Sequence, residues 1–394
     1  MHPLDAADPL SGYRDLFVPS DGLVAYLDGN SLGRPLTASA ERLARFAREE
    51  WGGRLIRGWD EGWLDLPLTL GDALGAHVLG AGPGQVAVAD STSVLIYKLI
   101  RAAVDARPGR DEIVVDRGNF PSDRYVVEGI AADRGLTVRW LEPDAASGVT
   151  PELVAGAVSE RTAVGLFSSV AYRSGFLGDV PGITAVLHDS GALAMWDLCH
   201  SAGVVPTPLD EWRVDLAVGC GYKYLNGGPG APAFLYVRRE LQGELRQPIH
   251  GWIGSRTPFE MGQGFEPADG IRGFLSGTPP ILAMQPLVDM VALIAHVGLD
   301  AIRTKSMELT GHAIELVDQH LPDALLASPR DPSARGGHIT IDHPRFAELL
   351  PRLWAAGIIP DFRRPDGLRI GCSPLSTSFA EVEAGVLAIR DALR

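Results

Sequence analysis

The chain has 394 residues, of which 46% are apolar, with 35 Lys and Arg against 49 Asp and Glu and a formal net charge of −14. This composition is typical of a globular protein with a substantial core, and the length fits two or three domains or one large domain with an appendage. The acidic balance and the absence of a Lys and Arg cluster argue against a nucleic-acid-binding protein.

The sequence carries no signal for secretion or membrane insertion. Its first residues lack the basic and apolar regions of a signal peptide, and polar residues interrupt the most apolar stretch, 281–299. The three cysteines, Cys199, Cys220 and Cys372, are too widely spaced for a disulfide framework or a Cys-x-x-Cys metal site. We therefore expect a cytoplasmic protein with no membrane partner.

The first regular element is predicted after an irregular stretch that ends in Asp28-Gly-Asn-Ser-Leu-Gly33. From Thr37 to Trp51 apolar residues recur at helical spacing, which predicts an amphipathic helix. Trp59 and Trp63 follow among glycines, and packing in the core is the ordinary role of such tryptophans.

From about residue 80 short apolar runs alternate with helical stretches. This alternation is typical of an α/β protein whose mostly parallel sheet carries helices on both faces and binds ligands beyond the carboxyl ends of its strands. The predicted strands are 85–89, 112–116, 136–141, 162–170, 192–197, 214–220 and 232–237, and the predicted helices are 91–106, 122–134, 151–158 and 183–188.

The C-terminal part has a different pattern. A long helical stretch, 282–318, leads to a compact α+β unit. In that unit we expect strands at 338–342, 358–363 and 368–371 and helices at 344–356 and 379–393. The expected organisation is an N-terminal arm and helix (1–50) that joins the small domain, a large domain (51–300) and a small C-terminal α+β domain (301–394).

The strongest chemical signal lies where the strand 214–220 runs into Gly221-Tyr-Lys223-Tyr and a glycine-rich turn. A lysine at such a place could simply extend past its tyrosines to water. The strand 192–197 ends in Asp197 at the same edge of the sheet. A buried carboxylate there needs a cationic partner, although capping of the next helix is an alternative role.

Two further strand ends bring polar groups to this edge. Thr92 and Ser93 begin a helix, so their hydroxyls and backbone N–H groups form a possible anion site. Phe120 and Asp123 likewise lie where a strand passes into a helix. Each of these positions alone is explained by helix capping.

Together the four features match the requirements of pyridoxal 5′-phosphate: a lysine for a Schiff base, an aspartate for the pyridinium nitrogen, a stacking ring and a helix N-terminus for the phosphate. The sequence has neither a phosphate-loop motif nor a dinucleotide-binding fingerprint. His338 and His343 have no third ligand nearby, so no metal site is expected.

At these residues the sequence resembles the kynureninase family, in its bacterial form. Its members are pyridoxal phosphate enzymes of the aspartate aminotransferase fold that cleave L-kynurenine to anthranilate and L-alanine in tryptophan catabolism. The resemblance covers nearly the whole chain. It is carried by Tyr26-Leu-Asp-Gly-Asn-Ser-Leu-Gly33, Phe120–Asp123, Asp197–Gly203, Gly221–Gly230, Gly251–Gly254, Gly277–Ile281 and Leu368–Gly371.

The resemblance implies a role for each matching residue. Lys223 would form the Schiff base, Asp197 would pair with the pyridinium nitrogen and Phe120 would stack on the ring. Arg369 would bind the substrate α-carboxylate, a task suited to a planar guanidinium. Tyr222 is our candidate acid, because a phenol can deliver a proton without leaving a stranded charge.

The other matching residues are expected around the cofactor and the substrate. The resemblance also implies a homodimer with shared active sites. Thr92, Ser93, Asp123, Ser168, His200 and Tyr222 would contact the cofactor, as would Trp252 and Thr278 from the second subunit, and Trp59, Ser255, Asn30 and Ser31 would contact the substrate.

One position departs from the family pattern. Many relatives carry histidine where this chain has Ser255, on the side of the aryl group, which leaves the cofactor chemistry intact. Trp59 and Thr278 are of the bacterial kind and favour unsubstituted kynurenine over its 3-hydroxy form. An enzyme acting on a ring-substituted kynurenine in secondary metabolism is the alternative, and Ser255 is its only indication.

Two other functions deserve comparison. A cysteine desulfurase of the same fold needs a nucleophilic cysteine on a mobile loop, whereas the three cysteines here lie in or next to strand motifs. A catalytically idle binding protein is disfavoured because Lys223, Asp197 and Arg369 are all present.

Overall fold

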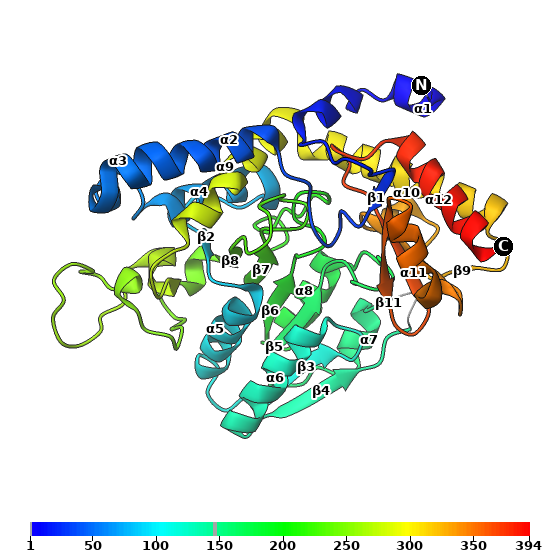
Figure 1. Cartoon of the computed structure of the whole chain (residues 1–394). Helices are drawn as coiled ribbons and strands as arrows, with labels where there is room; N and C mark the ends of the chain where they lie inside the picture. The colour runs from blue at the N-terminus through cyan, green and yellow to red at the C-terminus, as the bar shows by residue number, and fades with distance from the viewer. Residues whose placement is uncertain (1, 145–147) are drawn as a thin grey trace.

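The computed structural model describes residues 2–144 and 148–394. In this part of the chain the strands form a seven-stranded sheet and a five-stranded sheet, each with its own hydrophobic core (Figure 1). The fold is therefore α/β with a smaller C-terminal α+β unit, as the sequence predicts.

The large sheet has the strand order β2-β8-β7-β6-β5-β3-β4. All neighbouring pairs are parallel except those of β8, which runs antiparallel to both β7 and β2. This confirms the predicted mostly parallel seven-stranded sheet. Its strands are β2 (Val86–Ala89), β3 (Glu112–Asp116), β4 (Thr137–Leu141), β5 (Thr162–Ser168), β6 (Leu193–Asp197), β7 (Leu216–Cys220) and β8 (Ala233–Val237).

Helices cover both faces of this sheet because alternate strand residues are apolar on both sides. In β6, Leu193 and Met195 join one core cluster while Ala194 and Trp196 join the other. The first face carries α5 (Thr92–Asp105) and α6 (Pro121–Arg134), and the second carries α4 (Leu66–Leu74), α7 (Pro151–Ala155) and α8 (Val180–Asp189).

The small sheet has the order β1-β11-β12-β10-β9. Three helices pack on it, and their apolar residues form its core together with those of the strands. The strands are β1 (Ala25–Leu27), β9 (Leu325–Leu326), β10 (His338–Asp342), β11 (Ile358–Arg363) and β12 (Gly367–Gly371), and the helices are α10 (Leu299–His320), α11 (Phe346–Ala355) and α12 (Phe379–Leu393).

Strand β1 corrects the expectation of an irregular segment before Asp28. Its three residues pair in parallel with β11, so that Ala25 lies opposite Ile358 and Leu27 opposite Pro360. Three residues are too few for a periodic signal, and the pairing strand lies far away in the sequence, so local pattern could not reveal it.

The predicted helix 282–318 is also wrong as one element. The structure has two helices, α9 (Ile281–Val297) and α10, which meet at an angle of 88°. Gly298 between them has φ +86, a conformation that glycine adopts without steric cost and that ends the first helix. Among the described residues no single helix is long and apolar enough to cross a membrane, although this bent pair passes the same test when taken together.

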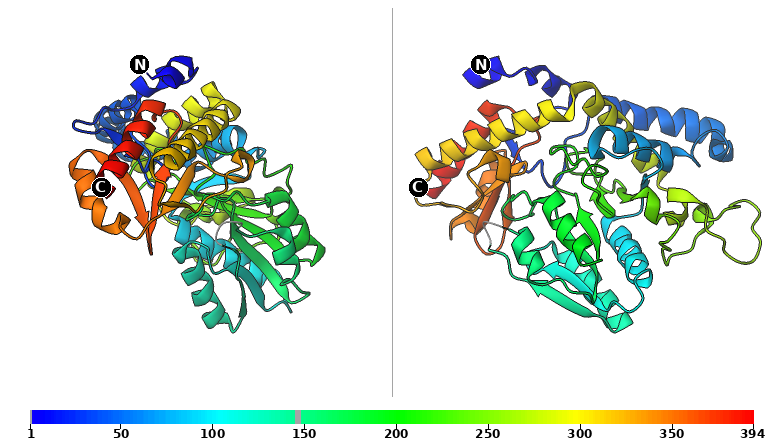
Figure 2. Two further views of the ribbon diagram at one scale, coloured as in Figure 1. Left: turned by 90° about the vertical axis from the view of Figure 1, so that its right-hand side faces the viewer. Right: turned by 180° about the vertical axis from the view of Figure 1, so that it is seen from behind.

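The N-terminal segment contacts both halves of the molecule. β1 joins the small sheet, whereas α2 (Thr37–Arg45) packs along α9, as Figures 1 and 2 show. The helical path continues beyond α2 to residue 54, which extends the predicted helix 37–51. We propose domain boundaries after residues 50 and 300.

The remaining elements are short. α1 (Pro3–Ala7) and α3 (Gly52–Arg54) are α-helical. The π-helical segments are Phe46–Trp51 and Gly75–Leu79, and the 3₁₀ segments are Ser11–Leu16, Leu55–Trp59, Arg239–Leu241, Trp252–Gly254, Gly270–Phe274 and Pro332–Ala334.

A glycine fixes the junction of the N-terminal segment with the small sheet. Gly357 has φ +74, and its carbonyl oxygen accepts hydrogen bonds from the backbone N–H groups of Val24 (2.9 Å) and Ala25 (3.1 Å). A Cβ atom at position 357 would collide with the carbonyl oxygen of Gly22. Only glycine fits here, because both the conformation and the close approach exclude a side chain.

We predict that Gly357→Ala destabilises the protein more than Gly109→Ala, which is a matched control because Gly109 also has positive φ but no atom near its Cβ position. The control should lose about 1 to 2 kcal/mol from backbone strain. Gly357→Ala should lose roughly 1 to 3 kcal/mol more from the collision. Urea denaturation of both variants measures the difference, and equal losses would contradict the proposed contact.

Candidate active site

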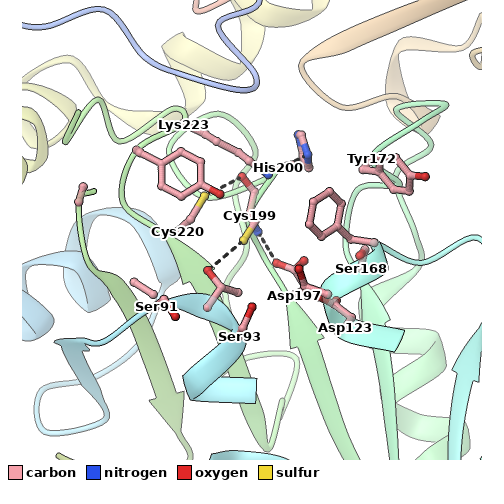
Figure 3. Close-up of a pocket in the computed structure, with 16 residues that line it drawn as sticks. Ser91, Ser93, Asp123, Ser168, Tyr172, Asp197, Cys199, His200, Cys220 and Lys223 are labelled. Atoms are coloured by element: carbon pink, nitrogen blue, oxygen red, sulfur yellow. Dashed lines mark hydrogen bonds between the residues drawn. The ribbon is translucent and has the colours of Figure 1, made fainter. Parts of the chain in front are cut away.

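A pocket opens at the carboxyl ends of β5, β6 and β7, where α5 and α6 begin (Figure 3). It brings together the cofactor contacts predicted from one subunit, which come from five separate stretches of the chain, but not Trp252 and Thr278. Its walls are formed by Ser91, Thr92, Ser93, Phe120, Ser122, Asp123, Ser168, Tyr172, Asp197, Cys199, His200, Cys220, Tyr222, Lys223, Ala231 and Ala233.

Lys223 lies just beyond β7 and is buried, with 8% of its surface exposed. Its Nζ lies 2.9 Å from Nε2 of His200 and 5.8 Å from the centre of the Phe120 ring. Within the described residues no carboxylate oxygen comes within 4.0 Å of this amine. The side chain therefore does not extend to water, and its amine is available for chemistry in the pocket.

Two buried carboxylates lie side by side in the pocket (Figure 3). Asp197 ends β6 and accepts a hydrogen bond from the backbone N–H of Cys199 at 2.7 Å. Asp123 is in the first turn of α6, and its Oδ2 has no hydrogen-bond partner among the described residues. Burial, and then the charge of Asp197, raises the pKa of Asp123 well above its usual value.

This carboxylate pair tests whether pyridoxal phosphate fits the site. Two buried carboxylates with one unpaired oxygen are costly unless a cation is placed between or beside them. The protonated pyridine nitrogen of the cofactor is such a cation, and Lys223 supplies the amine for its aldehyde. The residues present fit the group.

The other end of the pocket suits a phosphate. Ser91 precedes α5 but its side chain makes no capping hydrogen bond, so backbone N–H groups of the first turn remain open. Thr92 and Ser93 place two hydroxyls at the same helix end, and Thr92 Oγ1 lies 3.8 Å from Cys199 Sγ. An anion is stabilised by these donors and by the helix dipole.

The predicted stacking ring, Phe120, packs against Tyr172. The contact is edge-to-face, with ring centroids 5.4 Å apart and an interplanar angle of 88°. Next to it, the Ser168 hydroxyl donates to Oδ1 of Asn119 at 2.7 Å. Tyr172 was not predicted from the sequence, although it follows β5 and the rule that ligands bind at strand ends could have found it.

The small sheet contributes a second residue that the sequence did not reveal. His338 in β10 packs against His200, with ring centroids 5.4 Å apart, and neither nitrogen of His338 has a hydrogen-bond partner among the described residues. Burial, followed by the Lys223 charge for His200 and the Arg369 charge for His338, lowers the pKa of both histidines. Both imidazoles are therefore neutral near pH 7.

Arg369 in β12 lies beside the pocket and is almost completely buried, with 1% exposed. Its Nη1 donates to the backbone carbonyl of Tyr172 at 2.6 Å, and its Nη2 donates to the Ser31 hydroxyl at 2.7 Å. Asn30 is fully buried against Gly371 and does not line the pocket. The structure therefore joins Arg369 and Ser31 to the pocket wall through Tyr172.

Four predicted residues lie outside this pocket, and we call them the Trp252 group: Trp59, Trp252, Ser255 and Thr278. The Trp252 indole donates to the Thr278 hydroxyl at 3.3 Å, and Trp59 packs edge-to-face on Trp252 with centroids 5.7 Å apart. Ser255 follows Trp252 by three residues, at the end of the same 3₁₀ turn. Within one chain these residues do not meet Lys223.

All three cysteines are buried. Cys199 and Cys220 are buried in the pocket wall, and Cys372 is buried in the small core. The sequence placed all three in or beside strands but did not reveal that two of them face the pocket. Among the described residues there is also no group of three or more His, Cys, Asp or Glu side chains that could hold a metal ion.

Solved structures with the same fold include cysteine desulfurases and a cystine lyase. The apo cysteine desulfurase of Thermococcus onnurineus NA1 superposes with a TM-score of 0.80 at 17% identity, covering 93% of this chain and 94% of that chain. The cysteine desulfurase CsdA of Escherichia coli gives 0.82 at 18% identity, covering 98% of both chains. At such identities the likeness establishes the fold alone.

Sequence comparison is more specific. The family model of the kynureninase C-terminal domain matches residues 302–389. The kynureninase of Burkholderia pseudomallei strain K96243 is 41% identical over 399 residues, covering 99% of this chain and 94% of that protein. The kynureninase of Pseudomonas fluorescens is 40% identical over 389 residues, covering 96% and 91%. With this identity over nearly its full length, and with the pocket around Lys223 intact, the chain belongs to the kynureninase family.

Proposed function

We propose that the protein hydrolyses L-kynurenine to anthranilate and L-alanine, a step of tryptophan catabolism, with pyridoxal phosphate bound at Lys223. The observation that carries the proposal is the buried Lys223 amine beside the paired carboxylates of Asp123 and Asp197, in a chain 41% identical to a kynureninase. In this reaction water supplies the hydroxyl group that leaves with the aryl carboxyl group and the hydrogen that ends on alanine.

The chemistry divides between the cofactor and the chain. Bound pyridoxal phosphate supplies an electron sink for the electron pairs released at the substrate Cα and Cβ atoms. Asp197 would hold the proton on the ring nitrogen, because a buried carboxylate favours a cation beside it, and Asp123 lies next to it in the pocket. Lys223 carries protons to and from the substrate, and neutral His200, 2.9 Å away, can exchange a proton with it.

Tyr222 is the proposed acid that returns a proton to the product carbon. It lines the pocket beside Lys223, whose Nζ lies 6.0 Å from the centre of its ring. Burial raises the pKa of Tyr222 above its usual value, so the phenol stays protonated at neutral pH. A protonated phenol can donate, and Lys223 in its ammonium form can return a proton to the phenolate afterwards.

We also propose a cytoplasmic homodimer in which each site takes residues from both chains. The Trp252 group lies away from Lys223, and exposed apolar side chains lie near it in the sequence: Phe259 is 53% exposed and Met261 is 72% exposed. The segment that carries them projects from the body of the molecule (Figures 1 and 2). Exposed apolar surface of this kind is typical of an interface.

We predict that the purified protein is yellow and that borohydride reduction fixes a phosphopyridoxyl group on Lys223. Lys223→Ala should retain little turnover, because it removes both the attachment point and the proton carrier. Peptide mapping of the reduced protein identifies the modified lysine. Modification of Lys98, which is buried in an ion pair with Asp90, or of any other lysine would contradict the assignment.

The shared site predicts that two inactive variants restore each other. A mixed dimer of Lys223→Ala and Trp252→Ala chains should contain one intact site, so equal mixing after subunit exchange should restore roughly a quarter of the wild-type activity. Lys223→Ala mixed with Phe120→Ala is the control, because those two residues line the same pocket of one chain and no intact site results. Recovery in the control alone, or in neither mixture, would contradict a site built in this way.

We predict a preference for L-kynurenine over 3-hydroxy-L-kynurenine. The group formed by Trp59, Trp252 and Thr278 is mostly apolar, and burying the extra hydroxyl unpaired costs about 1 to 3 kcal/mol, or roughly 5- to 150-fold in kcat/KM. Comparison of kcat/KM for the two substrates measures this. Equal values, or a preference for the hydroxylated substrate that disappears in Ser255→Ala, would favour a ring-substituted substrate instead.

A further inference from the structure

Arg369 has an ionic partner that the sequence did not reveal. Asp361 lies directly opposite it on the neighbouring strand β11, and Oδ2 of Asp361 lies 2.5 Å from Nη2 of Arg369. The same oxygen lies 2.9 Å from Nε of Arg363. Cross-strand pairs of opposite charge stabilise a sheet only modestly when exposed, but Arg369 is 1% exposed, and Asp361 compensates its buried charge.

The other contacts of Arg369 define the orientation of its guanidinium. Nη1 contacts the carbonyl of Tyr172 and Nη2 contacts the Ser31 hydroxyl, so both point toward segments that belong to or adjoin the pocket. Nε–H has no acceptor among the described residues. Asp361 on β11 therefore contacts the guanidinium, and the Nε–H group of Arg369 remains free to donate a hydrogen bond.

A competing acceptor lies close by. Oδ1 of Asp28 is 4.0 Å from Nη2 of Arg369, and Asp28 lies just after β1, where it bridges to Gly371 at the end of β12. Loss of the Asp361 charge would leave Asp28 as the nearest carboxylate for the guanidinium. Burial raises the pKa of Asp28 to about 6, so at pH 8 this carboxylate is ionised and able to attract Arg369.

We propose that Asp361 is a positioning residue, which holds the Arg369 guanidinium against Tyr172 and Ser31 in the orientation that receives the α-carboxylate of the substrate. The proposal rests on the proposed function of Arg369 as the carboxylate clamp. Asp361 itself touches neither substrate nor cofactor and acts only through the arginine.

A bridge that merely stabilises the small sheet would affect all ligands alike, so the test compares two ligands that differ in the carboxylate. Titration of the holoenzyme at pH 8 with L-alanine and with ethylamine, followed by the absorbance of the bound cofactor, gives a dissociation constant for each. In Asp361→Asn, affinity for L-alanine should fall by about tenfold or more, because the charged partner of a buried arginine is lost. Affinity for ethylamine and the cofactor content should stay unchanged.

A double-mutant cycle shows whether Asp361 acts through Arg369. Arg369→Lys keeps the charge but loses the fork, and it should weaken L-alanine binding by about tenfold or more. If Asp361 works through the guanidinium, adding Asp361→Asn to Arg369→Lys should change L-alanine binding by much less than it does in the wild type. Additive losses would overturn the proposal.

Two further variants complete the test. Asp366→Asn removes the same charge in the turn between β11 and β12 and should leave the ratio of the two dissociation constants unchanged. Asp361→Glu keeps the charge and should recover most of the L-alanine affinity, and it decides the question if the asparagine variant does not fold. Equal weakening of both ligands in either Asp361 variant would assign a purely structural role and overturn the proposal.

The outcome for the wild-type protein separates this inference from the proposed function. If the wild type binds L-alanine no more tightly than ethylamine, then Arg369 is not a carboxylate clamp, and both assignments fail together. If the wild type discriminates and Arg369→Lys abolishes the discrimination while Asp361→Asn does not, only the role of Asp361 is refuted.

Discussion

The arrangement depends on one electrostatic constraint: two carboxylates and one lysine are buried at the edge of a parallel sheet without being paired to one another. Asp123 and Asp197 face each other in the pocket, and Lys223 has a histidine, not a carboxylate, at its amine. Buried charges are tolerated only when a counterion compensates them. A cationic ring that carries an aldehyde would place its positive charge beside the carboxylates and its aldehyde at the amine of Lys223, so the residues present fit this kind of cofactor.

The two sheets contribute different residues to the site. The large sheet supplies the cofactor side, whereas the small sheet brings His338 and Arg369 against it, with Tyr172 in contact with Arg369 and with the stacking ring of Phe120. Strand β1 and the turn after it place Ser31 on the same arginine. The contacts around Arg369 therefore form only when the N-terminal segment, the small sheet and the large sheet have all assembled.

The same fold serves different chemistry in its structural relatives. Cysteine desulfurases superpose on nearly the whole chain, yet the cysteines here are buried in the pocket wall or the small core, and no exposed loop of the described residues carries one. What distinguishes this chain is the set of groups around the fold's common edge. The proposed carboxylate clamp Arg369, its strand partner Asp361 and the remote Trp252 group are the parts to which we assign the choice of substrate.

Local sequence was sufficient to predict the large sheet and the residues on the cofactor side of the site. Buried parallel strands are continuous apolar runs, and each polar residue that ends such a run, Asp197 among them, is brought to one edge by the topology of the fold. Tertiary structure alone decided the pairing of β1 with β11, the break at Gly298, the approach of His338 to His200 and the contact of Asp361 with Arg369. The physical reason is that these features depend on partners distant in sequence or on a single backbone conformation, and neither leaves a periodic trace in the chain.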